Sequence, residues 1–111
     1  KSRPGERRAV VMTLLAIEKD GRLLMWRRAE DSARLAGFWE LPESEMAPDA
    51  EIVGVAGTFR HSITNTTYEM VVKRARLARK PLGFSWLDED QLRTLPLSTT
   101  ARKAIALLAP R

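Results

Sequence analysis

The chain has 111 residues, of which 44% are hydrophobic and 30% charged, and these proportions predict a single folded domain. It has no cysteine and one histidine, His61, which excludes disulfides, thiolate zinc sites, iron–sulfur clusters and histidine-rich metal sites within these residues. Lysine and arginine number 19 against 14 acidic residues, a formal net charge of +5 that fits either an anionic partner such as nucleic acid or ordinary solubility.

The N-terminal stretch is polar and leads into the longest apolar run of the sequence. Residues 1–8 contain Pro4 and Gly5, so we interpret them as a linker, with the domain at 9–109 and the whole as a piece of a longer protein. The apolar run at 9–17 is far shorter than the roughly 20 residues that cross a bilayer, so no membrane association is expected.

Short apolar segments predict about five strands, mostly antiparallel. The run at 9–17 is rich in β-branched residues and is typical of a central strand buried on both faces. Asp20 and Gly21 favour the positive φ of a tight hairpin, which predicts a second strand at 22–28. Further strands are expected at 51–59, 68–78 and 84–87.

The segments between these strands are polar or interrupted. Gly54 and Gly57 predict bulges in the strand at 51–59. The acidic segment 43–50 contains a proline and is expected to be a loop, and the hydroxyl-rich segment 61–67 is expected to be a polar turn.

Two short helices are expected at the end of the chain. Asp88 and Gln91 have the spacing of a capping box, and Pro96 ends the helix that they begin. Ser98 or Thr99 caps a last helix that reaches residue 108. Its apolar face is made by Ala101, Ile105 and Leu108. The predicted class is therefore α+β, with the helices late in the chain.

Motifs of familiar enzyme classes are absent from the sequence. There is no Gly-x-Ser-x-Gly elbow, no phosphate-binding loop and no Gly-x-Gly-x-x-Gly. Five acidic residues could in principle hold a hard cation: Glu40, Glu43, Glu45, Asp49 and Glu51. A proline among them breaks helical spacing, so we favour a solvated acidic loop.

Four segments form a combination that is more specific than any one of them. They are Arg-Leu-Leu-Met-Trp-Arg-Arg at 22–28, Leu-Ala-Gly-Phe-Trp-Glu-Leu-Pro at 35–42, Phe-Arg-His-Ser-Ile-Thr-Asn at 59–65, and the tail at 86–103 with its Leu-Pro-Leu-Ser. Together they resemble the Nudix fold, and within it the C-terminal domain of bacterial A/G-specific adenine DNA glycosylase. The resemblance covers about residues 7–108 and implies a Nudix-like mixed β-sheet with flanking helices.

The resemblance also shows what this sequence lacks. Working Nudix hydrolases carry Arg-Glu-x-x-Glu-Glu on a helix after the Gly-x-Trp segment, and its carboxylates hold Mg²⁺ on the substrate's diphosphate. Here the motif is absent, and only residues 43–50 separate Pro42 from the next strand. We therefore expect that helix to be shortened or absent, and we assign no catalytic residue and no metal ligand.

The glycosylase family removes adenine mispaired with 8-oxoguanine, in base excision repair. Excision belongs to an N-terminal helical domain that usually holds an iron–sulfur cluster, so the resemblance implies a cofactor-free, non-catalytic domain here. Its implied partners are that N-terminal domain of the same chain and duplex DNA with an 8-oxoguanine:adenine mismatch, in the bacterial cytoplasm. The alternatives are a Nudix hydrolase of (oxidised) nucleoside diphosphate derivatives and a Nudix-fold protein-interaction module.

The family's lesion-recognising Phe-Ser-His loop falls on Ile63, Thr64 and Asn65. Thr64 keeps a hydroxyl that can bond a base edge, Ile63 offers an apolar wedge, and Asn65 offers an amide. Residues expected to contact the DNA backbone are Arg60, His61, Ser62, Lys73, Arg74 and Arg76. Without the resemblance, residues 63–65 are a plain β-turn, His61 is a strand-end histidine, and the cations of 73–80 form a solvated face.

Overall fold

The computed structural model describes residues 8–109. Most of the expected linker, residues 1–7, lies outside this range, and Arg8 is already the first residue of a strand. No helix in the described part of the chain is long and apolar enough to cross a membrane.

The described residues form six strands and three short helical segments. In chain order they are β1 (Arg8–Lys19), β2 (Arg22–Arg27), β3 (Trp39–Glu40), the 3₁₀ turn η1 (Ser44–Met46), β4 (Glu51–Ile63), β5 (Thr66–Arg76), β6 (Phe84–Leu87), α1 (Glu89–Thr94) and α2 (Thr99–Ala106). The α+β class with late helices is confirmed, and the two-residue β3 is an addition to the five strands predicted from the sequence.

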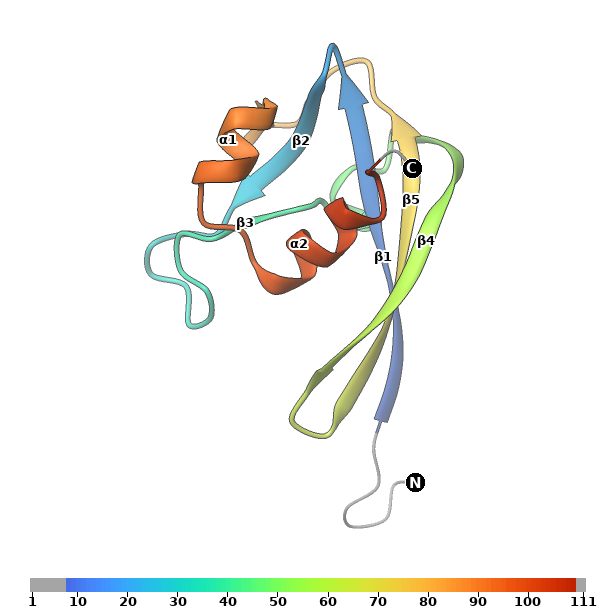
Figure 1. The fold of residues 1–111 in the computed structure, drawn as a ribbon, viewed down its shortest axis with the longest axis vertical. Helices are drawn as coiled ribbons and strands as arrows, with labels where there is room; N and C mark the ends of the chain where they lie inside the picture. The colour runs from blue at the N-terminus through green and yellow to red at the C-terminus, as the bar shows by residue number, and fades with distance from the viewer. Residues whose placement is uncertain (1–7, 110–111) are drawn as a thin grey trace.

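The strands form a mixed sheet that opens into two parts. β1 runs parallel to β5, and β5 pairs antiparallel with β4. β1 and β2 are joined by the predicted Asp20-Gly21 turn, where both residues have positive φ, and they pair only beside that turn. β2 also pairs with β6 from Leu23 to Trp26 and with β3 at Trp26 and Arg27, and away from the turn β1 and β2 diverge (Figure 1).

The β4–β5 hairpin is the longest ladder of the fold. Its register runs from Glu51 opposite Arg76 to Ile63 opposite Thr66, with irregularities at Gly54 and Gly57, where bulges were predicted. The expected polar turn at 61–67 is wrong, since only two residues lie between β4 and β5. The flanking residues are strand because β-branched threonines and isoleucine favour it and the ladder continues through them. The tip projects beyond the body of the protein, beside the start of β1 (Figure 1).

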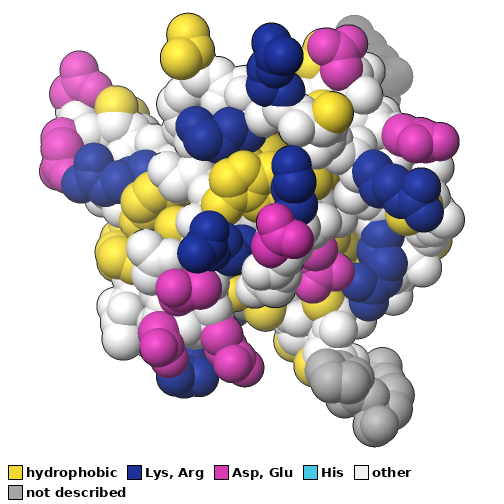
Figure 2. All heavy atoms as spheres, turned by 90° about the horizontal axis from the view of Figure 1, so that it is seen from above, with side chains coloured by type: hydrophobic (Ala, Val, Ile, Leu, Met, Phe, Trp, Pro, Cys, Tyr) yellow, Lys and Arg dark blue, Asp and Glu magenta, His cyan; other side chains and the backbone are white. Residues whose placement is uncertain are grey.

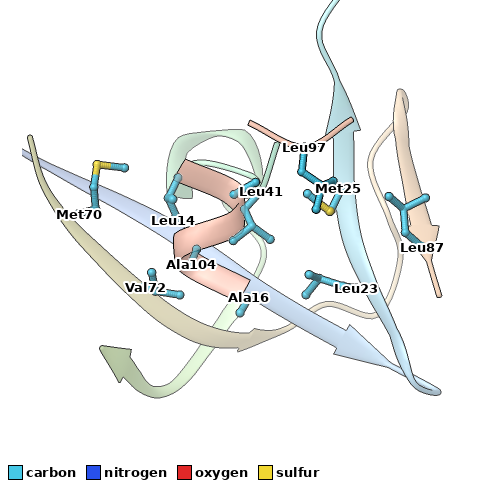
Figure 3. Packing of buried hydrophobic residues seen from close by; sticks show 11 residues of the cluster. Leu14, Ala16, Leu23, Met25, Leu41, Met70, Val72, Leu87, Leu97 and Ala104 are labelled. Carbon is cyan, nitrogen blue, oxygen red and sulfur yellow. The ribbon is translucent and has the colours of Figure 1, made fainter. Parts of the chain in front are cut away.

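The hydrophobic core lies between α2 and one face of the sheet. Figure 3 shows the side chains of this cluster, which come from β1, β2, β5 and β6, from α2 and from the segments after β3 and before α2: Leu14, Ala16, Leu23, Met25, Leu41, Met70, Val72, Leu87, Leu97 and Ala104. A second cluster on the opposite side includes Leu15, Ile17 and Ala47. β1 is buried on both faces only from Leu14 to Ile17, because its first half extends along the projecting hairpin, where Val11 is 71% exposed.

Both helices begin with the caps that the sequence predicts. The Asp88 side chain accepts a hydrogen bond from the Gln91 backbone N–H, and the Gln91 side chain accepts one from the Asp88 backbone N–H. Ser98, rather than Thr99, caps α2 by accepting from the Ala101 N–H. The second cap fixes the start of α2 beside β3, next to the cleft.

Candidate functional site

The hairpin distributes the predicted DNA-contacting residues between two faces of the sheet. His61 and Ile63 line the cleft, so the alternation of strand side chains directs Arg60 and Ser62 to the opposite face. The Arg60 side chain is 78% exposed, and its Nε donates to Glu69 Oε1 over 3.1 Å. The structure therefore brings these four residues together along the strand but not onto one surface.

The tip holds the three residues predicted to recognise the lesion. Thr64 and Asn65 are exposed, and Ile63 is half-buried at the edge of the cleft. Thr64 has φ +48°, a conformation that β-branched residues rarely adopt, and its hydroxyl donates to the Ile63 carbonyl over 2.7 Å. The Arg8 N–H donates to the Asn65 carbonyl over 2.8 Å, so β1 braces the turn. A two-residue hairpin turn commonly needs a positive φ, so the geometry of the turn accounts for the conformation of Thr64.

The cations of β5 lie far from the tip. Lys73 is on one face of the strand and Arg74 and Arg76 are on the other, with Arg74 Nη1 donating to Glu18 Oε1 over 2.9 Å. About ten residues of strand separate Arg76 from the tip, which is roughly 33 Å. At the end of the molecule opposite the tip, cationic and anionic side chains are interspersed (Figure 2). The predicted backbone-contacting set is therefore not one continuous patch.

A cleft of about 210 Å³ lies where β1 and β2 diverge. Its apolar wall comes from alternate residues of the sheet and from the loop after β2: Met12, Leu14, Leu35, Leu41, Ile63 and Met70. Its aromatic and polar lining is Trp26, Arg28, Arg34, Glu40, Glu43, His61, Tyr68, Ser98, Thr99 and Thr100. Sequence reasoning did not predict this cleft, because its walls come from segments far apart in the chain. The only local signal was the period-two alternation of strand residues.

Glu40 is the buried carboxylate of the cleft and is held by three side chains. It is 8% exposed; Arg28 Nε donates to its Oε2 over 2.7 Å, and Ser98 Oγ donates to its Oε1 over 2.5 Å. Thr100 Oγ1 also donates to Oε1 over 3.3 Å. The Arg28 guanidinium lies 5.2 Å from the centroid of the Trp26 ring, a cation–π contact. This network ties β2, β3 and α2 together around the cleft.

His61 stands at the mouth of the cleft in cationic surroundings. Burial lowers the pKa of its imidazole below 6.5, and the charges of Lys103 and Arg34 lower that pKa further, against an opposing effect of Glu40. The Lys103 ammonium lies 5.8 Å from the centroid of the Phe59 ring. The lining of the cleft itself carries two arginines, Arg28 and Arg34, and two glutamates, Glu40 and Glu43.

The acidic residues do not fit the Mg²⁺ site of a Nudix hydrolase. Glu40 is bound in its ion pair, Glu43 lines the cleft, and Glu45, Asp49 and Glu51 are exposed. Between residues 8 and 109, no group of three or more acidic or histidine side chains could hold a metal ion. In the hydrolases the motif lies on a helix. At the corresponding place in this chain, the connection between β3 and β4 contains only the three-residue η1.

The chain was compared with family models, curated proteins and solved structures. No family model matches it, and no curated protein matches it. Among solved structures, a MutT Nudix hydrolase from Burkholderia pseudomallei is 20% identical, with a TM-score of 0.75 over 93% of this chain and 100% of the other. The ORF135 protein of E. coli is 16% identical, with a TM-score of 0.68 over 95% and 94% of the two chains.

The C-terminal domain of mouse MUTYH, solved in complex with human PCNA, is also similar. It is 19% identical, with a TM-score of 0.56 over 90% of this chain and 86% of the other. These similarities show that the chain has the Nudix fold, an α+β fold with a mixed sheet, here with only η1 in place of the motif helix. Several of the similar structures are Nudix hydrolases, and the mouse MUTYH domain is among the others.

Proposed function

We propose that this chain is the Nudix-fold C-terminal domain of an adenine DNA glycosylase of base excision repair. In this proposal it binds duplex DNA around 8-oxoguanine opposite adenine and performs no chemistry itself. The observation that carries the proposal is the projecting β4–β5 hairpin, whose tip presents Thr64 and Asn65 to solvent. Within residues 8–109, no carboxylates are grouped to hold magnesium. The similarity to the mouse MUTYH domain supports it.

The shape of the hairpin suits a nucleic-acid groove. The major groove of B-DNA admits a two-stranded β-ribbon, and the projecting ends of β4 and β5 have this form. The Asn65 amide can both accept and donate hydrogen bonds to a base edge, and the Thr64 hydroxyl, which donates its proton to the Ile63 carbonyl, can accept one. In this proposal the exposed Arg60 exchanges its ion pair with Glu69 for a contact to a phosphate.

Excision of adenine in this proposal is the task of an N-terminal helical domain of the same chain, where the iron–sulfur cluster is expected. That domain would act on an adenine rotated out of the helix, while the Nudix-fold domain holds the opposite strand. The expected location is the bacterial cytoplasm, at the nucleoid.

The proposal is tested by fluorescence anisotropy with an 8-oxoguanine:adenine duplex and a matched guanine:adenine duplex. We expect affinity to fall steeply between about 50 and about 200 mM salt, because phosphate contacts release counterions. In the full-length enzyme, Thr64→Ala should reduce the preference for the lesion roughly fivefold, the loss of about 1 kcal/mol from one hydrogen bond. Thr58→Ala, in β4 and away from the tip, is the control.

Two outcomes would contradict this assignment. Equal affinity for the two duplexes, unaltered by Thr64→Ala, would show that the tip does not recognise the lesion. Binding that does not depend on salt would exclude phosphate contacts altogether.

The second candidate is a Nudix hydrolase of oxidised nucleoside diphosphate derivatives. The similar MutT Nudix hydrolase structures and the cleft beside Glu43 favour it. It requires release of phosphate or nucleotide from 8-oxo-dGTP with Mg²⁺, abolished by Glu43→Gln and Glu45→Gln. Such turnover would overturn the non-catalytic proposal.

A Nudix-fold protein-interaction module is the third candidate. The mouse MUTYH domain was solved with a protein partner, which favours it. Absence of duplex binding, together with absence of turnover, would leave this candidate in place of the other two.

A further inference from the structure

We infer that the groove between α1 and α2 binds an acidic amphipathic segment of a partner protein. Such a segment carries apolar side chains on one side and carboxylates beside them. The groove is separate from the cleft, because the two linings share no residue, and it is separate from the hairpin tip. The inference goes beyond the proposed DNA binding and does not depend on it.

The groove is open and lies between two helices that follow each other in the chain (Figure 1). Its volume is about 400 Å³, within the range of roughly 300–1,000 Å³ in which ligand sites are found. Its apolar floor comes from both helices and from the segment that joins them: Leu92, Leu97, Ile105 and Ala106. The groove is therefore large enough to take side chains of another chain.

The apolar floor is only partly covered by the protein itself. No residue of α1 is buried, and its Leu92 is half-buried. Ile105 of α2 is also half-buried, whereas Leu97 is 5% exposed and packs in the core. A side chain placed in the groove would remove the remaining apolar surface of Leu92 and Ile105 from water, which favours binding.

The charge of the groove selects an acidic partner. The two charged side chains in its lining are both arginines, Arg93 from α1 and Arg102 from α2. Arg102 is exposed and makes no ion pair within residues 8–109, and α2 itself contains no acidic residue. Arg93 is paired with Asp90, but both side chains are largely exposed, so a partner carboxylate can replace Asp90 at little cost.

A protein segment fits this surface better than the backbone of a nucleic acid. Glu89 and Asp90 are exposed at the start of α1 and would repel a continuous run of phosphates. A protein segment can place single carboxylates opposite Arg93 and Arg102 and leave the start of α1 free. Its apolar side chains would also cover the floor of the groove, which phosphates cannot do.

The length of the groove limits the size of the contact. α2 has eight residues and is about 12 Å long, which matches roughly two turns of a partner helix. Two turns place apolar residues at positions i and i+4 on one face, with room for a carboxylate beside them. The partner segment is therefore a short amphipathic helix with two apolar side chains in the groove.

The experiment selects peptides of about 12 residues from a random displayed library on the 111-residue chain. We expect the retained peptides to combine two apolar residues at helical spacing with at least one acidic residue. A retained peptide is then synthesised with a fluorescent label and titrated by anisotropy. Its contact is mapped by backbone amide shifts, which we expect at Leu92, Arg102 and Ile105.

Matched variants separate the groove from general charge. Arg102→Gln should weaken the peptide about fivefold, as the loss of an exposed charge pair allows, and Arg102→Glu should weaken it more. A peptide whose acidic residue is replaced by lysine should bind Arg102→Glu better than it binds the unmodified chain. Arg79→Gln removes the same charge from an exposed position between β5 and β6, outside the groove lining, and should leave the affinity unchanged.

Four results would overturn the inference. They are a selection that retains no peptide, retained peptides without acidic residues, amide shifts that lie outside the groove, and equal affinity for Arg102→Gln and the unmodified chain. Displacement of the peptide by duplex DNA, with shifts at the groove amides, would assign the arginines to phosphates and would also overturn it. Absence of duplex binding would contradict the proposed function but leave this inference standing, because the tip and the groove share no residue.

Discussion

Two arginine–glutamate pairs of similar geometry differ chiefly in burial. Arg28 and Glu40 are joined over 2.7 Å with side chains 27% and 10% exposed, whereas Arg60 and Glu69 are joined over 3.1 Å with side chains 78% and 42% exposed. Removing one member of a buried pair leaves an uncompensated charge, but an exposed pair is screened by water. The two pairs should therefore differ strongly in their contribution to stability.

We expect Glu40→Ala to lower the free energy of unfolding by about 3 kcal/mol, because Arg28 and the Ser98 hydroxyl lose their partner. Glu69→Ala should lower it by less than about 1 kcal/mol. Urea denaturation of both variants beside the unmodified chain measures the difference. Equal losses would show that the Glu40 network does not stabilise the fold as its burial indicates.

His61 should make stability depend on pH. The pKa of its imidazole is lowered in the folded chain by burial and by Lys103 and Arg34, so below 6.5 the unfolded chain binds the proton more readily than the folded chain. The stabilisation relative to His61→Gln is therefore complete above 6.5 and is lost as pH falls from 6.5 through the folded-state pKa. Denaturation of both proteins across this range measures it. A difference that stays constant, or grows as pH falls, would contradict the lowered pKa.

The conformations and hydrogen bonds of single residues were predictable from the sequence where the partner residues are close in the chain. The Asp88–Gln91 capping box and the Asp20-Gly21 turn depend on neighbours within three residues, and both are present. The three side chains that hold Glu40 lie 12, 58 and 60 residues away, so the sequence showed only an acidic residue in an acidic segment. The roles of Thr64 and Asn65 came from the resemblance and stay predictions.

At the scale of elements, the two glycines of β4 differ in what surrounds them. Gly57 has φ +157°, and a Cβ there would lie 3.2 Å from the Leu107 side chain. A Cβ added at Gly54 would have no other heavy atom within 4 Å, and the φ of Gly54 is not positive. Both occur at register irregularities of the same strand, so they form a natural comparison.

We expect Gly57→Ala to destabilise the protein by about 1–2 kcal/mol, because the new methyl group adds backbone strain and displaces Leu107. Gly54→Ala should be neutral or stabilising by up to about 0.5 kcal/mol, because it restricts the unfolded chain without a clash. Thermal and urea denaturation measure both changes. If Gly54→Ala lowered the free energy of unfolding as much as Gly57→Ala, the irregularity at Gly57 would be no more constrained than the one at Gly54.

Helices and strands with a clear local sequence pattern were predicted correctly. Elements that depend on pairing with residues distant in the chain were not predicted. The strands at β1, β2 and β6 and both capped helices follow from periodicity and caps. The residues flanking Thr64 and Asn65 are rich in hydroxyls, which favoured a long turn, but cross-strand pairing with β1 and β5 extends the strands through them. β3 is only two residues long, and its pairing with β2 leaves no periodic pattern.

At the scale of the whole molecule, function depends on which elements of the Nudix fold are present. The divergence of β1 and β2 creates the cleft, and α2 closes one side of it. The other feature that a Nudix hydrolase needs, a helix that presents several carboxylates together, is reduced to η1. The fold class and this reduction were both predictable from the sequence, because the missing motif is local. The cleft was not, because it is a property of the assembled sheet.

The reduction of the motif helix to η1 leads to a prediction about magnesium binding. If the chain had a site with a dissociation constant of about 0.1 mM, about 10 mM Mg²⁺ would stabilise it by about 2.7 kcal/mol. For a domain of this size that corresponds to a rise of roughly 10 °C or more in Tm. Because the acidic residues of 8–109 do not converge, we expect Mg²⁺ to leave Tm unchanged within about 1 °C of an EDTA sample at matched ionic strength. A rise of several degrees that Glu43→Gln removes would establish a metal site at the cleft and restore the hydrolase as the better assignment.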